Sequence, residues 1–236
     1  MANMKRILFG IFAHPDDEAF GPSGTLLQEV RDGSELHLIC ATRGEAGNNP
    51  DHHADLGTVR EQEWRASGQQ LGATTMTQLH YPDGGLGNQL YLEIAGKLKT
   101  TINEVLNDQH EPVDLQFITF EPGGLTGHLD HIAISLITTF VYASLQEQTP
   151  KSVEQLGLRY FCLSDKQVPT ANIDWIFQPA GLPSDMIDET RDVTDMKEQK
   201  LAVMAAHHSQ RDDAAMIKAR WGDALQTECF YYPDSR

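Results

Sequence analysis

Short apolar runs alternate with amphipathic stretches along the first two thirds of the chain. Such runs, continuous rather than alternating over residues 5–13 and 35–42, are typical of strands covered on both faces of a parallel sheet. They predict strands over residues 5–13, 35–42, 76–81 and 113–120. The stretches between them predict helices over residues 17–32 (clearest over 24–31), 57–71, 90–107 and 128–146.

After Thr149 the alternation of strand and helix patterns becomes less regular. Residues 158–164 and 173–178 still have the pattern of strands, and residues 193–208 that of a last helix. Repeated strand–loop–helix units predict an α/β fold, a Rossmann-like and mostly parallel sheet with helices on both faces. No repeat, low-complexity tract or linker divides the sequence, so residues 1–236 are expected to form a single domain.

The composition of the chain disfavours two classes of binding partner. The 236 residues include 34 acidic and 18 basic side chains, a formal charge of −16, which disfavours nucleic acid and anionic lipid surfaces because both are bound through cationic clusters. No apolar stretch approaches the roughly 20 residues of a membrane span. The three cysteines, Cys40, Cys162 and Cys229, lack metal-ligand spacing and are expected to be buried free thiols of a cytoplasmic protein.

The loops that follow the predicted strands hold the unusual polar residues. In open parallel sheets, ligands bind beyond the carboxyl ends of the strands. The first such loop contains His14, Asp16 and Asp17. If the chain turns helical after Pro15, His14 and Asp17 are three residues apart and face one point, while Asp16 projects differently. Taken alone, acidic residues after a proline also suit a helix N-terminus without any metal.

A second cluster follows the fourth predicted strand. His128 and His131 have the same three-residue spacing, and Asp130 lies between them. His131 could complete a site of two histidines and one carboxylate, with Asp130 orienting a histidine. Two histidines at a helix start are equally typical of a cap. Two such clusters at strand ends together favour a metal site over either alternative.

Zinc suits this ligand set, and the residues fit metal-assisted hydrolysis. Asp16 would act as the general base, and His128 would stabilise the oxyanion or protonate the leaving amine. No serine or cysteine in these loops has the neighbours of a covalent nucleophile, which favours direct attack by water.

Six motifs carry a resemblance to a known family: residues 14–18, 42–47, 60–63, 81–85, 127–131 and 206–210. In this order they resemble the LmbE/PIG-L family of zinc-dependent deacetylases over residues 5–210. The resemblance implies a Rossmann-like fold and removal of acetyl from N-acetylglucosamine-type groups. It also implies His14, Asp17 and His131 as zinc ligands, Asp16 as base, and His128 as oxyanion stabiliser or acid. Some members have a tyrosine where this chain has Thr126.

Two further residues are candidate substrate contacts. Arg60 could bind a sugar hydroxyl or could pair with Glu63 on an exposed helix face. Asp83 lies in a Pro-Asp-Gly-Gly turn that by itself explains it, yet the position also allows a hydroxyl contact.

Three loop or rim positions carry weaker expectations. Arg43 and Glu45 are expected to form an ion pair within their loop. His207 is expected at the end of the last helix, as a supporting or rim residue.

The leading function is therefore deacetylation of a small N-acylated amino sugar or its conjugate. The alternatives are an amidase for a larger acyl group and a metal-binding module without catalysis. A nucleotide-binding oxidoreductase is disfavoured because the Gly-x-Gly-x-x-Gly turn is absent after the first strand. The oligomeric state does not follow from the sequence.

Overall fold

A seven-stranded sheet organises the computed structural model, which describes residues 4–168 and 181–235. Its strand order is β3-β2-β1-β4-β5-β7-β6. The first five strands in this order run parallel, and β7 runs antiparallel to both of its neighbours. The strands are β1 (Lys5–Phe12), β2 (Glu35–Thr42), β3 (Thr75–Tyr81), β4 (Val113–Phe120), β5 (Val153–Cys162), β6 (Glu189–Asp192) and β7 (Thr227–Tyr231).

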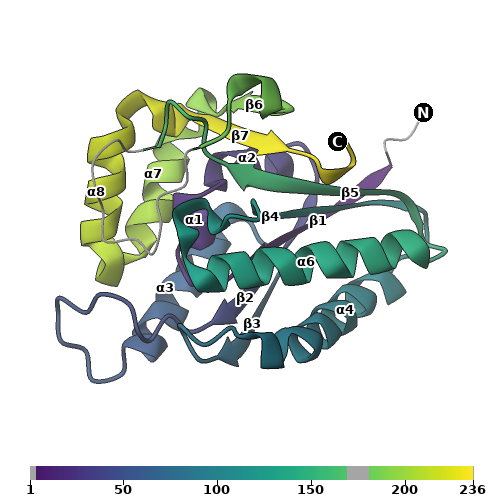
Figure 1. Cartoon of the computed structure of the whole chain (residues 1–236), viewed down its shortest axis with the longest axis horizontal. Coiled ribbons are helices and arrows are strands. Elements are labelled where there is room, and N and C mark those ends of the chain that lie inside the picture. The colour runs from purple at the N-terminus through teal and green to yellow at the C-terminus, as the bar shows by residue number, and fades with distance from the viewer. Residues whose placement is uncertain (1–3, 169–180, 236) are drawn as a thin grey trace.

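Helices cover both faces of this sheet (Figure 1). They are α1 (Asp17–Phe20), α2 (Ser23–Arg31), α3 (Leu56–Leu71), α4 (Tyr91–Asn107), α5 (Gly124–Gly127), α6 (Leu129–Glu147), α7 (Lys197–Ala206) and α8 (Arg211–Trp221). The predicted Rossmann-like, mostly parallel α/β domain is confirmed. In the described ranges, no helix is both long and apolar enough to cross a bilayer.

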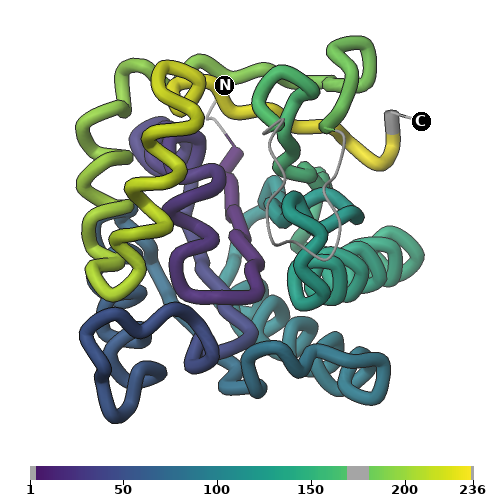
Figure 2. The backbone as a smooth tube through the Cα atoms, turned by 60° about the vertical axis from the view of Figure 1, so that its left-hand side comes forward, coloured from purple at the N-terminus to yellow at the C-terminus, as the bar shows by residue number. Residues whose placement is uncertain are grey.

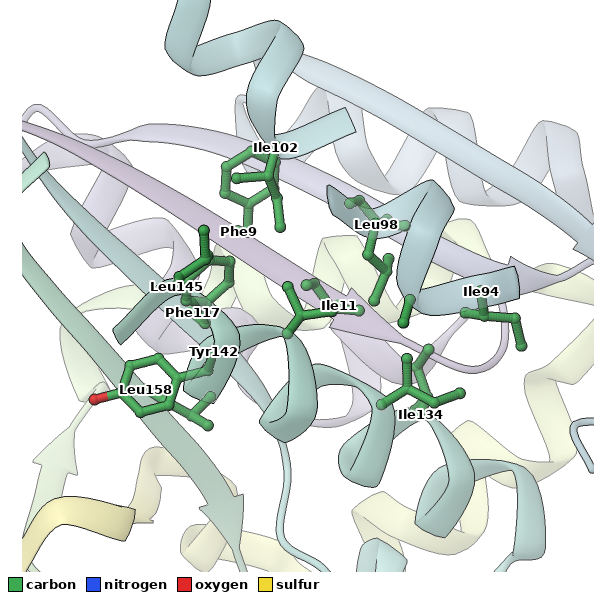
Figure 3. Close-up of a cluster of buried hydrophobic side chains, with 14 of the residues drawn as sticks. Phe9, Ile11, Ile94, Leu98, Ile102, Phe117, Ile134, Tyr142, Leu145 and Leu158 are labelled. Carbon is green, nitrogen blue, oxygen red and sulfur yellow. The ribbon is translucent and has the colours of Figure 1, made fainter. Parts of the chain in front are cut away.

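The alternation of side chains along β1 builds the two cores. Ile7, Phe9 and Ile11 point to the face covered by α4 and α6, where they pack in the cluster drawn in Figure 3. Leu8 and Phe12 point to the opposite face, which α2, α3 and α7 cover. A strand buried on both faces must be apolar at every position, which explains the continuous run in the sequence.

The first helices of the chain pack against its last helices on one face of the sheet. Helix α7 packs against α1, α2 and α3, and α8 packs against α7. Figures 1 and 2 show these yellow-green helices beside the purple first helices. The last part of the chain therefore contributes to the surroundings of the loop that follows β1.

Several predicted elements differ from the structure. The helix predicted over 17–32 is broken into α1 and α2, because Gly21 and Pro22 interrupt it. The last helix is shorter than predicted and ends at Ala206. β5 begins at Val153, five residues before the predicted strand, and the strand predicted over 173–178 lies outside the described residues. Pattern analysis missed α5, α8 and the antiparallel strands β6 and β7. All three cysteines are buried free thiols, as predicted.

Candidate metal and catalytic site

The two polar clusters meet because β1 and β4 are adjacent parallel strands. Strand order reverses between them: β2 and β3 lie on one side, and β5 on the other. Ligands bind in open α/β sheets at such a reversal, beyond the carboxyl ends of the strands. The loop after β1 carries the first cluster to this point, and the loop after β4 carries the second.

Two imidazole nitrogens and the carboxylate of Asp17 converge there. His14 Nδ1 lies 3.1 Å from His131 Nε2 and 3.6 Å from Asp17 Oδ2, while His131 Nε2 lies 3.2 Å from Asp17 Oδ1. Tetrahedral zinc with bonds of about 2.1 Å separates its ligand atoms by about 3.4 Å. These residues therefore fit a small divalent cation, and all three side chains are buried.

The remaining polar atoms of this trio are held by neighbours. Asp17 Oδ2 accepts hydrogen bonds from the backbone N–H groups of Ala13 (3.1 Å) and His14 (2.8 Å). His131 Nδ1 lies 3.0 Å from the carbonyl oxygen of Gly124, so its proton belongs on Nδ1 and the Nε2 lone pair faces the cluster. Such partners orient metal-binding histidines. Burial opposes ionisation of Asp17, but His131 and His14 outweigh it and hold the pKa of Asp17 well below its usual range.

Two further carboxylates face the other nitrogen of His14. Its Nε2 lies 3.0 Å from Asp83 Oδ1 and 3.4 Å from Asp130 Oδ2. Asp130 is fixed by the N–H groups of Gly84 (2.7 Å) and Leu86 (3.0 Å). Burial opposes a charge on His14, but Asp130, Asp17 and Asp83 outweigh it and raise its pKa well above the usual value. The same three carboxylates, which stabilise a proton on His14, would also stabilise a metal cation bound beside it.

Other combinations of these side chains also come close enough to hold a metal: His14 with His128 and His131, and His14 with Asp83 and Asp130. In the second set, backbone N–H groups reach both carboxylate oxygens of Asp130, whereas those on Asp17 both reach Oδ2 and its Oδ1 faces His131. The first contains His128, whose Nδ1 is occupied by a hydrogen bond from a backbone N–H. The trio that includes Asp17 is therefore the better ligand set.

Asp16 lies beside this trio, and its side chain turns towards Arg60. Its Oδ2 accepts a hydrogen bond from Arg60 Nη2 at 2.7 Å. Burial raises the pKa of Asp16 to about 6, although the positive charge of Arg60 partly offsets the effect. A carboxylate with a pKa near 6 is ionised at neutral pH and basic enough to accept a proton.

Arg60 is buried within α3 and also donates to the carbonyl oxygen of Gly44 at 2.8 Å. The alternative of an exposed pair with Glu63 is wrong, because Glu63 accepts hydrogen bonds from Ser209 instead. Arg60 and Asp83 both line the cavity that contains the cluster. Each also contacts another polar side chain of the site.

His128 is both a helix cap and a neighbour of the cluster. Its Nδ1 accepts a hydrogen bond from the N–H of Asp130 at 3.2 Å, which caps α6 and leaves the proton of the neutral ring on Nε2. Its ring lies 4.7 Å from that of His14 between centroids. Burial and the neighbouring His131 and His14 lower the pKa of His128. His128 therefore suits a neutral hydrogen-bond donor better than an imidazolium acid.

A cavity of about 620 Å³ opens above the cluster. Its lining includes polar residues and also apolar side chains from several elements, among them Phe20, Leu125, Leu163, Met216, Ile217 and Trp221. Thr126, which replaces the tyrosine of some family members, also lines it. Three of the apolar residues lie on α8, which pattern analysis missed. Its signal was electrostatic: Asp212 and Asp213 begin the helix, and Lys218 and Arg220 end it.

The N–H groups at the start of α2 bind a carboxylate of the chain itself. Glu228 accepts hydrogen bonds from the N–H groups of Gly24 (2.9 Å) and Thr25 (2.7 Å). Lys200 pairs with the same carboxylate. Helix N-termini can bind phosphate, but Glu228 already occupies this one.

The expected ion pair between Arg43 and Glu45 is wrong. Arg43 pairs with Asp55 and Glu61, while Glu45 accepts from the N–H of Asp83 at 3.0 Å instead of pairing with Arg43. His207 directly follows α7, as expected, and is fully buried 2.8 Å from Glu18 Oε1, which agrees with a supporting residue and not with a rim residue.

Comparison with known proteins places this site in a family. The family model described as GlcNAc-PI de-N-acetylase, PIG-L, matches residues 9–142. A 1D-myo-inositol 2-acetamido-2-deoxy-alpha-D-glucopyranoside deacetylase of Mycolicibacterium smegmatis is 29% identical over 87% of this chain and 80% of its own length.

Solved structures share the fold. The N,N'-diacetylchitobiose deacetylase from Pyrococcus horikoshii superposes with a TM-score of 0.71 at 17% identity, covering 96% of this chain and 83% of that one. The 4-carboxy-2-hydroxymuconate hydratase GalB from Pseudomonas putida reaches 0.62 at 15% identity, covering 97% and 96%. The fold alone therefore does not select the reaction.

The sequence matches and the site together define an enzyme, an amide hydrolase that acts on C–N bonds other than peptide bonds. The chain belongs to the PIG-L family, whose model spans more than half of it.

Proposed function

We propose that the protein is a zinc-dependent deacetylase that removes the N-acetyl group from an N-acetylglucosamine-type amino sugar or its conjugate. The observation that carries this proposal is the convergence of His14, Asp17 and His131 at 3.1–3.6 Å beside the buried Asp16. The sugar substrate named for the mycobacterial relative supports the substrate class.

His14, Asp17 and His131 would hold the ion, because two imidazoles and a carboxylate suit zinc. Bound there, zinc would polarise the amide carbonyl and lower the pKa of a water molecule to about 7. The oriented nitrogens of both histidines and the ionised Asp17 prepare the ligand set before any metal arrives.

The chain's own residues would then move the protons and stabilise charge. Asp16, held by Arg60, accepts the proton of the attacking water and returns it to the departing amine. His128 donates from Nε2 to the developing oxyanion. Asp83 and Asp130 fix the ring of His14. The products are acetate and the free amino sugar.

The test is release of primary amine from N-acetylglucosamine and its conjugates by the purified protein. Asp16→Asn keeps a side chain of the same shape, so it should retain the metal and lose turnover on the order of 10²–10⁴-fold. Equal turnover in the parent and Asp16→Asn would overturn the assignment of Asp16 as base.

A second candidate, an amidase for a larger acyl group, is favoured by the apolar residues that line the cavity. Matched N-acetyl and N-octanoyl glucosamine conjugates separate the two. The deacetylase proposal requires the acetyl substrate to have the higher kcat/KM.

A further inference from the structure

The backbone of Asp16 adopts a conformation that residues other than glycine rarely take. Its φ is 111° and its ψ is −23°. Strained backbones of this kind cost on the order of 1–3 kcal/mol and persist only where the surroundings enforce them. Asp16 is the residue before α1, yet its side chain makes no capping hydrogen bond and turns to Arg60 instead. The unusual φ therefore determines where this carboxylate points.

A buried hydrogen-bond network holds the other side of Asp16. Its backbone N–H donates to Glu18 Oε2 at 3.2 Å. Glu18 Oε1 accepts from Ser67 Oγ at 2.5 Å and lies 2.8 Å from His207 Nε2. Glu18, Ser67 and His207 are fully buried, and they come from α1, α3 and the residue after α7. Segments far apart in the sequence thus hold the Glu18 carboxylate, which in turn accepts the hydrogen bond from the Asp16 N–H.

We propose that Glu18 and His207 are positioning residues that hold Asp16 in its left-handed conformation and aim its carboxylate at the reacting water. The inference rests on the proposed role of Asp16 as base. Neither Glu18 nor His207 is among the residues that line the cavity, so both act through Asp16. Without the Glu18 carboxylate, the N–H of Asp16 would lose its partner and φ would relax to negative values.

The competing explanation is that this pair only fastens α7 to α1. Glu228 provides a matched control, because it too is a buried glutamate that accepts backbone N–H groups and pairs with a buried cation, Lys200. Glu228 lies outside the catalytic machinery. A purely structural role predicts that Glu18 and Glu228 variants behave alike.

The experiment compares Glu18→Gln, Glu18→Leu and Glu228→Gln in the full chain by kcat, KM, zinc content and thermal stability. Glu18→Leu should lower kcat on the order of 10²-fold with KM and zinc content unchanged. Glu18→Gln keeps one acceptor oxygen and should recover part of that loss. Glu228→Gln should lose stability at parental kcat. Parental kcat in Glu18→Leu, or loss of zinc from it, would overturn the proposal.

If Glu18→Leu does not fold, His207→Leu and His207→Gln replace it, since glutamine keeps a donor to Glu18 and leucine does not. Higher kcat in His207→Gln than in His207→Leu is expected, and equal parental values would overturn the proposal. A crystal structure of His207→Leu gives a readout without turnover. Asp16 should show a smaller or negative φ and a longer distance to Arg60, and an unchanged Asp16 would contradict the inference. A parent without any amine release counts against the proposed function only.

Discussion

Arg60 Nη2 lies 2.7 Å from Asp16 Oδ2, and both side chains are buried. The contact joins the N-terminal part of α3 to the loop after β1, so a residue that is a candidate sugar contact also holds the proposed base. Arg60 also lines the cavity. The positioning role and the substrate role make different kinetic predictions.

Replacing Arg60 by lysine tests these roles. Lysine cannot reproduce the fork that contacts Asp16 and Gly44 together, so kcat should fall on the order of 10-fold or more with zinc retained. Steady-state kinetics provides the measurement. A raised KM at unchanged kcat would instead identify a uniform substrate contact.

Replacing any of His14, Asp17 and His131 by alanine should abolish metal binding, because each is one of the three converging side chains. Elemental analysis of purified variants measures this directly. His53→Ala is the matched control: His53 is a half-buried histidine that pairs with Asp51, and neither residue lines the cavity. Full zinc occupancy in His131→Ala would show that the third ligand is another residue.

His128 can be separated from its capping role with asparagine. Asparagine is a strong helix N-cap but is too short to place a donor where the imidazole Nε2 lies. His128→Asn should therefore keep parental stability and zinc, while kcat and kcat/KM fall together on the order of 10²-fold. Near-parental kcat would show that His128 does not stabilise the oxyanion.

The pH dependence of stability should reflect Glu29. Burial opposes its ionisation, but Arg159, Arg6 and Arg191 outweigh it and lower the pKa of Glu29 from 4.5 to about 2. The folded state thus binds this proton less readily than the unfolded chain does. The resulting stabilisation is complete above pH 4.5 and is lost as pH falls towards 2.

Glu29→Gln should consequently cost on the order of 3 kcal/mol at pH 7 and less at pH 3, as measured by denaturant unfolding. Asp195→Asn is the control, since Asp195 is an exposed acid paired with Arg31, and exposed ion pairs contribute little to stability. A cost for Glu29→Gln that does not change between pH 7 and pH 3 would contradict the assigned pKa.

Hydrophobic pattern predicted the parallel half of the sheet well. Strands over 35–42 and 113–120 agree with β2 and β4 to the residue, because both strands are largely buried and consist mostly of apolar residues. Strand β6 was missed since its sequence, Glu-Thr-Arg-Asp, lies at a sheet edge with alternating exposure. Edge strands have no continuous apolar signature.

The spacing of the polar residues predicted which side chains lie together in the site, but not which role each of them has. Arg60 looked like an exposed residue because its helix is polar, and only the packing of α3 against the loop after β1 buries it. His207 is distant from Glu18 in the sequence, and their pairing depends on α7 meeting α1. Such tertiary contacts leave no local pattern.

The central claim is that the trio of His14, Asp17 and His131 holds a zinc ion required for deacetylation. Its most direct test is to strip the parent with a chelator and titrate zinc back while recording amine release from an N-acetylglucosamine conjugate. Activity should vanish on stripping and return to a maximum near one zinc per chain. Turnover that persists in the stripped protein would contradict the account.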